Sequence, residues 1–472
     1  MKHFIKSIFL LLALLGTATH ALAFDFVVDG IFYNIENSNA TVTHQYPTNY
    51  PNYYSRYSGD VTIPRTVTYN GITYPVTKIG ESAFARSYNM TSVTIPNSVT
   101  HIGEQAFYEC SGLTNLTIPN SVTQIDDWAF YGCTGLTNVT IPESVTRIGE
   151  NVFLYCSGLS SIVVASGNTT YDSRDNCNAI IYTEIDHLIS GCKNTIIPNT
   201  VKTIGTRAFA GCSDLTSITI PNSVTLTGFY AFGDCTGLTS VTISNSLTSI
   251  SLGMFWGCSS LTSVDIPNSV TYIEGDAFFE CIGLTNVTIP ESVKKIDYTA
   301  FSGCTGLTNV TIPNSVTTII EGAFSDCTGL SSVTIGSSVT LIQYDAFKHT
   351  ALTSVTCLAI TPPYIYPSTF DSENYNNATL YVPAVSLTAY QTDSCWKKFY
   401  SILPISEEPS EEPGDVDGDG NIGIADVTAL IDAILTGNMS NISITAADVD
   451  FNGSVDIADV TALIDYILTG NW

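Results

Sequence analysis

The stretch YGCTGLTNVTIPESVTRIGENVFLYCSGL, residues 131–159, contains one full period of a repeat. Its two cysteines, Cys133 and Cys156, lie 23 residues apart, and this spacing recurs along most of the chain. Copies of LTNVTIPESVTRIGENVFLYC begin at Leu113, Leu136, Leu284 and Leu307, with more divergent ones at Met90, Leu159, Leu215, Leu238, Leu261, Leu330 and Leu352. A period of roughly 20 to 29 residues with L-x-x-L-x-L spacing is typical of a leucine-rich solenoid.

The apolar positions of one period predict how it folds. Leu136, Val139 and Ile141 are expected to point inward from a short strand, while the threonine and asparagine residues between them point out. Pro142 ends that strand, and Phe153 returns to the core on the far side of the turn. Because one turn cannot bury this face alone, stacked turns spaced by roughly 4.8 Å are expected to share a continuous core.

Two insertions interrupt the period. TYNGITY, around Asn70 and Gly71, has the turn residues of a β-hairpin. NAIIYTEIDHLISG, within an insert at about 165–191, has two apolar runs around a polar turn and predicts a second hairpin.

The thirteen cysteines admit three interpretations, namely disulfides, a metal array or a buried core. Nine of them share one repeat position: Cys110, Cys133, Cys156, Cys212, Cys235, Cys258, Cys281, Cys304 and Cys327. Stacking would hold their Cβ atoms near 4.8 Å apart, whereas a disulfide requires about 3.8 Å. A structural metal site would need histidine or a closed set of four ligands. We therefore expect a ladder of buried free thiols that pack as small hydrophobic groups.

Composition and the N-terminus bear on location. The 472 residues carry a net charge of −27, which argues against a nucleic-acid partner. Residues 1–23, MKHFIKSIFLLLALLGTATHALA, have the basic end, short apolar run and A-x-A site of a secretory signal. With no second long apolar run, no transmembrane segment is expected. The protein is expected to be secreted or associated with the cell surface.

The C-terminal part is acidic and duplicated. A Pro-Glu linker precedes DVDGDGNIGIADVTALIDAILTGN and DVDFNGSVDIADVTALIDYILTGN, which lie 33 residues apart. Each segment places oxygen ligands at the offsets of an EF-hand loop, with glycine at position 6. The expected ligands are Asp415, Asp417, Asp419, the carbonyl of Asn421 and Asp426 in the first loop, and Asp448, Asp450, Asn452, the carbonyl of Ser454, Asp456 and Asp459 in the second. Two Ca²⁺ ions are expected, one for each loop. Calcium is expected rather than zinc because neither loop contains histidine or cysteine.

Each loop runs into a predicted helix. Apolar residues repeat at i, i+3, i+4, i+7 and i+8 from Val427 to Leu435 and again from Val460 to Leu468. The two helices are therefore expected to pack face to face.

Candidate ligand-binding residues flank the repeated Ala-Phe pair. Stacked turns would align the aromatic residues there along one edge: Trp128, Tyr131, Tyr155, Phe229, Tyr230, Trp256, Phe279, Tyr298 and Tyr344. Exposed aromatics at this density indicate a contact surface, and the alternative is that half of them pack against the next turn. The outward threonines are interpreted as solvating a sheet face, with ice or a flat polymer as the alternative ligand. None of the six histidines has a ligand-spaced partner, so no enzyme is expected.

Two families are similar to parts of this chain. Residues 24–405 resemble the BspA-like leucine-rich repeat proteins through the IPxSVxxIGxxAFxxC copies, such as 141–156 and 289–304. That resemblance implies a curved solenoid with a parallel sheet, in proteins mostly used for adhesion and binding. Residues 414–472 are similar to type I dockerins, which pair two loop-helix units. In that family the residues that begin each helix bind a cohesin, and here these are Ile424, Ala425, Ile457 and Ala458. A basic pair used by the family is replaced by Ile431-Asp432 and Ile464-Asp465.

These observations predict a mainly β protein. A curved leucine-rich-repeat solenoid of 23-residue repeats with a parallel sheet is followed by a small α-helical calcium-loop domain. The expected parts are a signal peptide at 1–23, an N-terminal cap and first repeat with a hairpin insert at 24–89, the solenoid at 90–351, a C-terminal cap at 352–405, a linker at 406–414 and a dockerin-like domain at 415–472. The expected function is non-catalytic binding or adhesion, in which the solenoid recognises a protein or glycan ligand and the C-terminal domain docks to a cohesin-like partner. The alternative is an accessory component of a polysaccharide-degrading, cellulosome-like assembly.

Overall fold

The computed structural model describes residues 24–45, 57–405, 413–439 and 442–470. The expected signal at 1–23 and residues 406–412 of the expected linker lie outside the described residues. The chain divides into two units, Met1–Leu403 and Pro404–Trp472, and each is described by itself.

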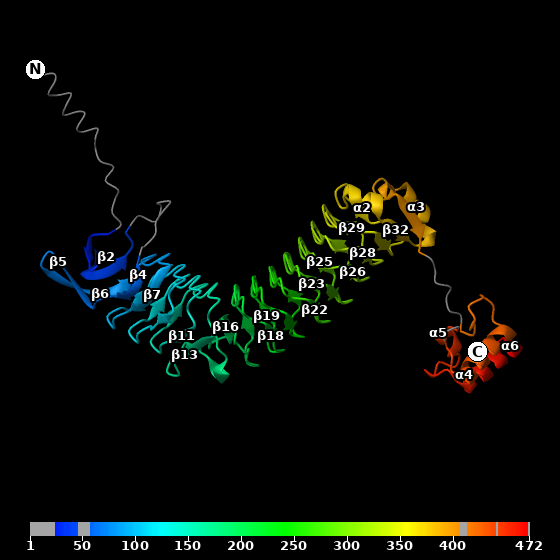
Figure 1. The fold of residues 1–472 in the computed structure, drawn as a ribbon, viewed down its shortest axis with the longest axis horizontal. Coiled ribbons are helices and arrows are strands. Elements are labelled where there is room, and N and C mark those ends of the chain that lie inside the picture. The colour runs from blue at the N-terminus through cyan, green and yellow to red at the C-terminus, as the bar shows by residue number, and fades with distance from the viewer. Residues whose placement is uncertain (1–23, 46–56, 406–412, 440–441, 471–472) are drawn as a thin grey trace, which may run out of the picture. The chain divides into compact units, whose positions relative to one another are not determined.

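The first unit is a parallel-sheet solenoid, as the repeat predicts, and its 23-residue turns, here called coils, stack one on another (Figure 1). Most coils contribute a leading strand from the LTNVTI segment and a short second strand ahead of the Ala-Phe pair. The leading strands are β4 (Ser58–Thr62), β7 (Asn89–Thr94), β9 (Asn115–Leu116), β11 (Asn138–Ile141), β13 (Ser161–Val164), β18 (Ser217–Thr219), β20 (Ser240–Thr242), β22 (Ser263–Asp265), β24 (Asn286–Thr288), β26 (Asn309–Ile312), β28 (Ser332–Ile335) and β30 (Ser354–Cys357). The second strands are β8 (His101–Ile102), β10 (Gln124–Ile125), β12 (Arg147–Ile148), β17 (Thr203–Ile204), β19 (Leu226–Thr227), β21 (Ser249–Ile250), β23 (Tyr272–Ile273), β25 (Lys295–Ile296), β27 (Thr318–Ile319), β29 (Leu341–Ile342) and β31 (Tyr364–Ile365).

Strand register follows the repeat length. Val139 of β11 pairs with Ile162 of β13, and Ile250 of β21 pairs with Ile273 of β23, in parallel. Each shift equals 23 residues, so equivalent side chains of successive coils lie directly over one another. A single position of the repeat therefore forms a continuous row along the solenoid.

The core consists of such rows. Leu136, Val139, Ile141 and Phe153 are buried, as predicted. The phenylalanine rings stack nearly parallel, with centroids 5.2 Å apart between Phe107 and Phe130. Two aromatic rows result: Phe84, Phe107, Phe130 and Phe153, and then Phe209, Phe232, Phe255, Phe278, Phe301, Phe324, Phe347 and Phe370.

All thirteen cysteines are free, and the nine at the repeat position are buried. Their thiols mostly donate to the carbonyl of the phenylalanine one coil earlier, as Cys133 does to Phe107 at 3.2 Å. Burial raises the pKa of Cys110 and of Cys327 to about 12. The row is a set of buried thiols, as expected from the stacking distance.

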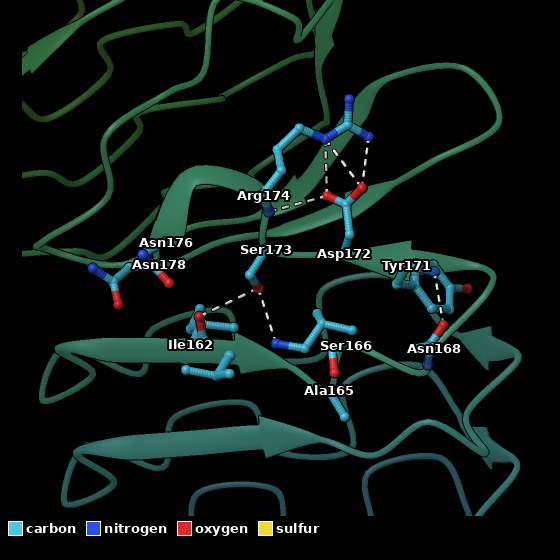
Figure 2. Close-up of a pocket in the computed structure, with 12 residues that line it drawn as sticks. Ile162, Ala165, Ser166, Asn168, Tyr171, Asp172, Ser173, Arg174, Asn176 and Asn178 are labelled. Carbon is cyan, nitrogen blue, oxygen red and sulfur yellow. Dashed lines mark hydrogen bonds and ion pairs between the residues drawn. The ribbon is translucent and has the colours of Figure 1, made fainter.

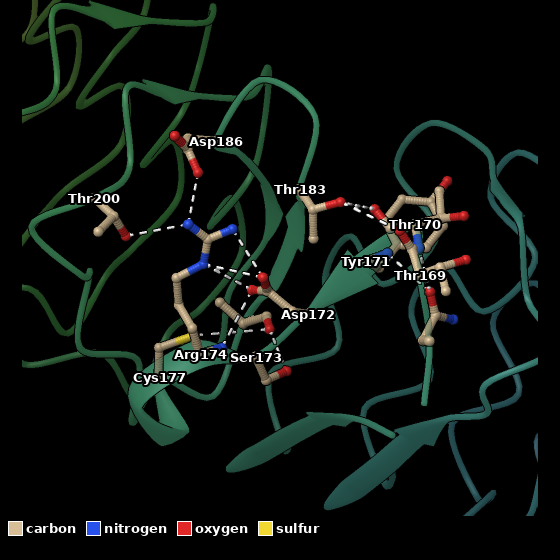
Figure 3. Close-up of polar contacts among 12 residues, drawn as sticks. Thr169, Thr170, Tyr171, Asp172, Ser173, Arg174, Cys177, Thr183, Asp186 and Thr200 are labelled. Atoms are coloured by element: carbon tan, nitrogen blue, oxygen red, sulfur yellow. Dashed lines mark hydrogen bonds and ion pairs between the residues drawn. The ribbon is translucent and has the colours of Figure 1, made fainter. Parts of the chain in front are cut away.

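The insert between the two aromatic rows forms an antiparallel meander. β14 (Tyr171–Asp172), η1 (Arg174–Asn176), β15 (Ile180–Tyr182) and β16 (His187–Ser190) follow one another, and β16 rejoins the solenoid by pairing in parallel with β17. Arg174 holds this meander together through Asp172 at 2.8 Å and Asp186 at 2.6 Å (Figure 3). The hydrophobic core divides at this point into two clusters.

Additional elements close both ends of the solenoid. At the start, β1 (Phe26–Val28), β2 (Ile31–Glu36) and β3 (Asn39–Thr43) form an antiparallel sheet, and β3 pairs with β6 (Ile72–Ile79). β5 (Thr66–Tyr69) and β6 form the predicted hairpin, with Asn70 and Gly71 both at positive φ. At the far end lie α2 (Ser372–Asn377), β32 (Thr379–Val382), η2 (Ala384–Ser386), α3 (Leu387–Thr392), η3 (Trp396–Lys398) and β33 (Ser401–Pro404).

The second unit is small and helical. It contains α4 (Ile424–Thr436), α5 (Ile444–Ala447) and α6 (Ile457–Thr469). Leu430 of α4 and Leu463 of α6 are buried in its core. The predicted apolar faces are wrong at their last positions, because Leu435 and Leu468 are 78% and 77% exposed. Val416, Ala447 and Val449 fill the core from the loops and α5, so the helix ends remain outside it.

Candidate functional sites

The first acidic loop lies directly before α4. Asp415 is buried; its Oδ2 accepts from Gly420 N at 3.0 Å, and its Oδ1 has no hydrogen-bond partner among the described residues. Ligand oxygens of Asp415, Asp417 and Asp419 lie within 4.8 Å of one another. Asp426 is buried and uses its carboxylate differently, accepting from the backbone N–H groups of Val416 and Gly423.

The second loop repeats this arrangement before α6. The Oδ2 of Asp448 accepts from Gly453 N at 3.0 Å, and its Oδ1 again has no partner among the described residues. Here Asp448, Asp450 and Asp459 bring their oxygens within 4.8 Å. Asp456 caps the N-terminus of α6, where its side chain accepts from Ala458 N at 2.8 Å. The aspartate at position 1 of each loop therefore has a buried oxygen without a hydrogen-bond partner in the described part of the chain. Both loops require a group that can pair with this oxygen.

A hard divalent cation fits that requirement. A buried carboxylate oxygen without a donor carries a desolvation cost that a cation removes. Desolvation, followed by the neighbouring charges of Asp426, Asp419 and Asp415, raises the pKa of Asp417. The donors are all oxygens, the set that calcium prefers. Asn421, Asn452 and Ser454 were predicted as further ligands, and all three are exposed within the loops.

The outer sides of α4 and α6 carry matching exposed rows. Ile424 and Leu435 of α4 lie on one face, at a spacing of eleven residues, and Ile457 and Leu468 of α6 repeat it. Ala425 and Ala458 are exposed beside them. These four isoleucines and leucines, with the two alanines, are called the helix-start stripes below.

On the solenoid, the nine aromatic candidates occupy the two tight turns that flank each Ala-Phe pair. Phe229, Tyr298 and Tyr344 are exposed, at 52%, 44% and 48%. The other six are half-buried: Trp128, Tyr131, Tyr155, Tyr230, Trp256 and Phe279. Several of these contact an aromatic neighbour in the next coil, for example Trp256 on Phe279 with ring centroids 6.2 Å apart.

Five of the nine candidates come together in one place, next to the insert. Two adjoining cavities of about 410 and 290 Å³ share Tyr155 and Arg207 and form what we call the aromatic groove. The first is lined by Gln105, Tyr108, Trp128, Tyr131, Leu154, Tyr155 and Arg207, and the second by Tyr155, Arg207, Ala210, Tyr230, Gly233, Asp234 and Trp256. Phe229, Phe279, Tyr298 and Tyr344 do not line it.

Tyr155 forms the wall between the two cavities. A Cβ at Gly211 would lie 2.2 Å from the Tyr155 ring, so only glycine allows the ring to lie across the next coil. The Tyr155 hydroxyl donates to the Asp234 carboxylate, two coils away. Burial and this carboxylate raise the pKa of Tyr155, so the phenol keeps its proton at neutral pH.

Arg207 is the cation of the groove. Its guanidinium carbon lies 5.5 Å from the centroid of the Tyr230 ring, and the side chain is exposed. Among the described residues it makes no ion pair and no side-chain hydrogen bond. Sequence reasoning missed it, together with Tyr108, Gln105 and Gly233. The repeat does contain a signal for Tyr108, because it directly follows Phe107 as Tyr131 follows Phe130, and their rings stack at 4.6 Å.

A third cavity, of about 440 Å³, lies between β13 and the insert (Figure 2). Several of its polar groups are already hydrogen-bonded or ion-paired within the protein. Arg174 bonds Asp172, and the Ser173 hydroxyl donates to the Ala179 carbonyl at 2.7 Å. These contacts fix the insert, so the cavity is better explained by folding of the meander than by ligand binding.

The fold and the loops define a leucine-rich-repeat solenoid joined to a duplicated acidic loop-helix module. Residues 77–189, 186–308 and 294–398 match the BspA type leucine rich repeat region. These matches span more than half of the chain, which belongs to this family. Residues 413–468 match the dockerin type I domain. Neither match is to a catalytic family. Dockerin type I domains typically bind calcium and imply a cohesin-type partner. Proteins of these two families are typically extracellular or at the cell surface.

Solved structures with similar chains are bacterial leucine-rich repeat proteins. A leucine rich cell surface protein from Faecalibacterium prausnitzii A2-165 is 30% identical over 63% of this chain and 94% of that chain, with a TM-score of 0.37. A leucine-rich repeat protein from Bacteroides ovatus ATCC 8483 is 27% identical over 77% of this chain and 81% of that chain, with a TM-score of 0.40. No curated protein matches the chain. None of the helices in the described ranges has the length and apolar character needed to cross a bilayer.

Proposed function

We propose that this protein is an exported, non-catalytic binding protein that is held in place by its C-terminal module. The solenoid recognises a ligand, and the module folds around two calcium ions and docks to a cohesin-type partner. The observation that carries the proposal is the repeated pairing of an orphan buried oxygen, on Asp415 and Asp448, with an exposed apolar row on the helix that follows.

The two ions are assigned to the two loops. Asp415, Asp417 and Asp419 supply carboxylates to the first ion, with Asn421 through its carbonyl and Asp426 at position 12. The second ion is held by the equivalent set: Asp448, Asp450, Asn452, Ser454, Asp456 and Asp459. Asp426 and Asp459 accept backbone N–H bonds, yet a carboxylate has about four acceptor sites and retains some for a cation.

The helix-start stripes are assigned as the docking surface. Ile424 and Ala425 on α4 match Ile457 and Ala458 on α6, so the module presents the same apolar surface twice. A partner that binds one stripe can bind the other after the module is turned around. Because both stripes are apolar, the partner surface is expected to be apolar as well, and docking is expected to be insensitive to salt.

Docking is tested with the full chain against immobilised cohesin modules, in calcium and then in chelator. We expect binding in calcium and none after chelation. Ile424→Asp and Ile457→Asp each place a charge on one stripe at the first residue of a helix, where an acid is favourable for the fold. Each single variant is expected to halve the association constant, because one of two equivalent orientations is lost. The double variant is expected to show no binding.

The matched control is Ile444→Asp. Ile444 also begins a helix and is 59% exposed, yet it lies on α5, outside the stripes. It should bind as the unmodified chain does. A chain that binds no cohesin module in calcium, or a double variant that still binds, would contradict the docking proposal.

The dockerin match also favours a second role, as an accessory component of a polysaccharide-degrading assembly. In that case the cohesin recovered with the protein belongs to a scaffold that also carries glycan-cleaving enzymes. Calcium-dependent capture from the native secretome, followed by identification of co-captured chains, distinguishes this role from free-standing adhesion.

A further inference from the structure

We propose that the aromatic groove binds an uncharged oligosaccharide. This inference rests on the proposed binding function of the solenoid and names the ligand class and the site. The groove combines three features on one surface: half-buried aromatic rings, polar side chains with hydrogen-bonding capacity to spare, and a length of several coils.

The rings supply apolar platforms. A pyranose ring has an apolar face of C–H groups, and aromatic rings offer a large, rigid surface for such a face. Trp128 and Tyr131 line the first cavity, and Trp256 lines the second. Neighbouring rings support these platforms, since Tyr131 stacks on Tyr108 and Trp256 on Phe279. Little side-chain entropy is lost on binding when the rings are held in this way.

The polar side chains of the groove can form hydrogen bonds with adjacent hydroxyl groups of a sugar. Arg207 offers five N–H donors in a fixed plane and uses none of them in a side-chain hydrogen bond within the described chain. Asp234 keeps acceptor sites beyond the bond from the Tyr155 hydroxyl. The Gln105 amide oxygen accepts from the Ser82 hydroxyl at 3.4 Å and keeps a second acceptor site, and its NH₂ group provides donors. A sugar with adjacent hydroxyl groups needs donors and acceptors side by side, and the groove has both.

The groove is continuous across the insert. Backbone bonds run from Gly132 N to Leu154 O at 2.9 Å, from Tyr155 N to Ala210 O at 3.3 Å and from Gly211 N to Gly233 O at 2.8 Å. Coils before and after the insert are therefore direct neighbours on this edge. From the coil of Gln105 to that of Trp256 there are five coil steps, or about 24 Å at the sheet spacing. That length accommodates an oligosaccharide rather than a single sugar.

These backbone bonds also argue against a peptide ligand. An extended peptide gains affinity by pairing with a free strand edge. Along this groove the backbone groups are already paired from coil to coil. Recognition here is left to side chains, as it is for sugars.

Charge argues against an acidic ligand. Asp234 lies in the groove, and Glu104 and Asp127 lie on the coils of Gln105 and Trp128. Desolvation and the charges of Glu81, Asp127 and Asp126 raise the pKa of Glu104, so the local potential is negative. One arginine does not offset these acids in a chain of net charge −27.

Titration calorimetry of the full chain tests the proposal, with cello-, xylo-, manno- and malto-oligosaccharides and with oligogalacturonate as the acidic probe. We expect at least one uncharged probe to bind. Trp128→Ala, Trp256→Ala and Arg207→Gln should each weaken that binding roughly tenfold or more. Tyr298→Ala and Tyr344→Ala remove exposed aromatics of the same edge outside the groove and should leave the affinity unchanged.

Gly233→Tyr is the sharpest variant, because it fills the groove and keeps every recognition group. A Cβ there would have its nearest neighbour at 3.4 Å, and the equivalent position holds Tyr131 and Trp256 in other coils. The fold should tolerate the tyrosine, with an unchanged melting temperature, while sugar binding is lost.

Unchanged affinity in Gly233→Tyr, binding of oligogalacturonate alone, or no binding to any uncharged probe would overturn the proposal. Cohesin docking is measured independently on the same protein. A chain that docks but binds no sugar refutes only the sugar site, whereas a chain that binds sugar but does not dock refutes only the docking role.

Discussion

The solenoid and the C-terminal module face the same problem, which is how a chain buries enough apolar surface to fold, and they solve it differently. In the solenoid, each coil is too small to be stable alone, and repetition supplies the missing surface. The module has two loop-helix units, and in its described part six buried residues form the apolar core. A unit of that size usually needs an additional stabilising element.

Charge distribution shows the same difference. From Glu407 to Trp472 there are fourteen acids and no lysine or arginine. In the solenoid, charged residues are sparse and often paired, as Lys193 is with Asp214 at 2.9 Å. In the module, by contrast, unpaired acids crowd around two loops in which a cation can offset their charge. Stability of the module is therefore expected to depend on an ion, and stability of the solenoid is not.

Removing calcium should produce the largest effect. Each ion adds about 2.7 kcal/mol to the free energy of unfolding when free calcium is one hundred times its dissociation constant. With chelator, we expect residues 413–470 to lose their fold, while the solenoid keeps its strands. Hydrogen exchange followed by mass spectrometry measures both regions in one sample.

Single loop variants sharpen this prediction. Asp415→Ala removes the residue with the orphan oxygen and should raise exchange in the first loop and α4 even with calcium present. Asp432→Ala is the control, because Asp432 is exposed on α4 and its side chain makes no hydrogen bond or ion pair with the described loop residues. Faster hydrogen exchange in the solenoid after chelation would contradict the prediction that only the module depends on calcium for its stability.

A core phenylalanine should give the second largest effect, confined to the solenoid. The Phe278 ring is fully buried and stacks between Phe255 and Phe301, at 5.4 and 5.1 Å. Phe278→Ala should lower the free energy of unfolding by about 3 to 5 kcal/mol. Because coils contact only their neighbours, faster exchange should appear in the adjoining coils and not in the module.

Phe279→Ala is the matched control, one residue away in the same coil. Its ring is half-buried against Trp256 at the surface. Its removal should cost far less, about 1 kcal/mol. Equal losses from the two variants would mean that the aromatic row is not the source of solenoid stability.

The sequence predicts the buried rows of the solenoid core better than it predicts which residues are exposed. The burial of Leu136, Val139 and Phe153 follows from the period alone, because every coil must solve the same packing problem. The hairpin at Asn70 and Gly71 follows from local turn chemistry. In the module, the exposure of Leu435 and Leu468 does not follow from helix periodicity, since loop residues fill the core from elsewhere.

The groove could be predicted only in part. Trp128, Tyr131 and Tyr155 stand out because they break the pattern of their coils. Arg207 and Gly233 do not, since their roles depend on how the insert leaves the solenoid while Tyr155 still pairs with Ala210. That connection is a fact of three-dimensional topology, and a period in a single sequence does not encode it.

The thiol row should contribute a smaller effect. Cys281 is fully buried, and its thiol donates to the Phe255 carbonyl at 3.1 Å. Cys281→Ala removes one buried atom and should lower the free energy of unfolding by about 1 kcal/mol, measured in urea. Were this cysteine disulfide-bonded, its loss would cost about 2 to 4 kcal/mol, and only under non-reducing conditions.

The outward threonine row should contribute least. The Thr239 hydroxyl donates to the Thr216 carbonyl at 3.0 Å, which looks like a stabilising ladder. However, the same carbonyl already accepts from Thr239 N at 2.9 Å, so it stays satisfied when the hydroxyl is removed. Thr239→Val keeps the shape and the β-branch that favour a strand. Its free energy of unfolding should therefore stay within about 0.5 kcal/mol of the unmodified protein. A larger loss would show that the outer face helps to hold the coils together. It would contradict the view that the core alone stabilises the solenoid while the threonine face only contacts solvent.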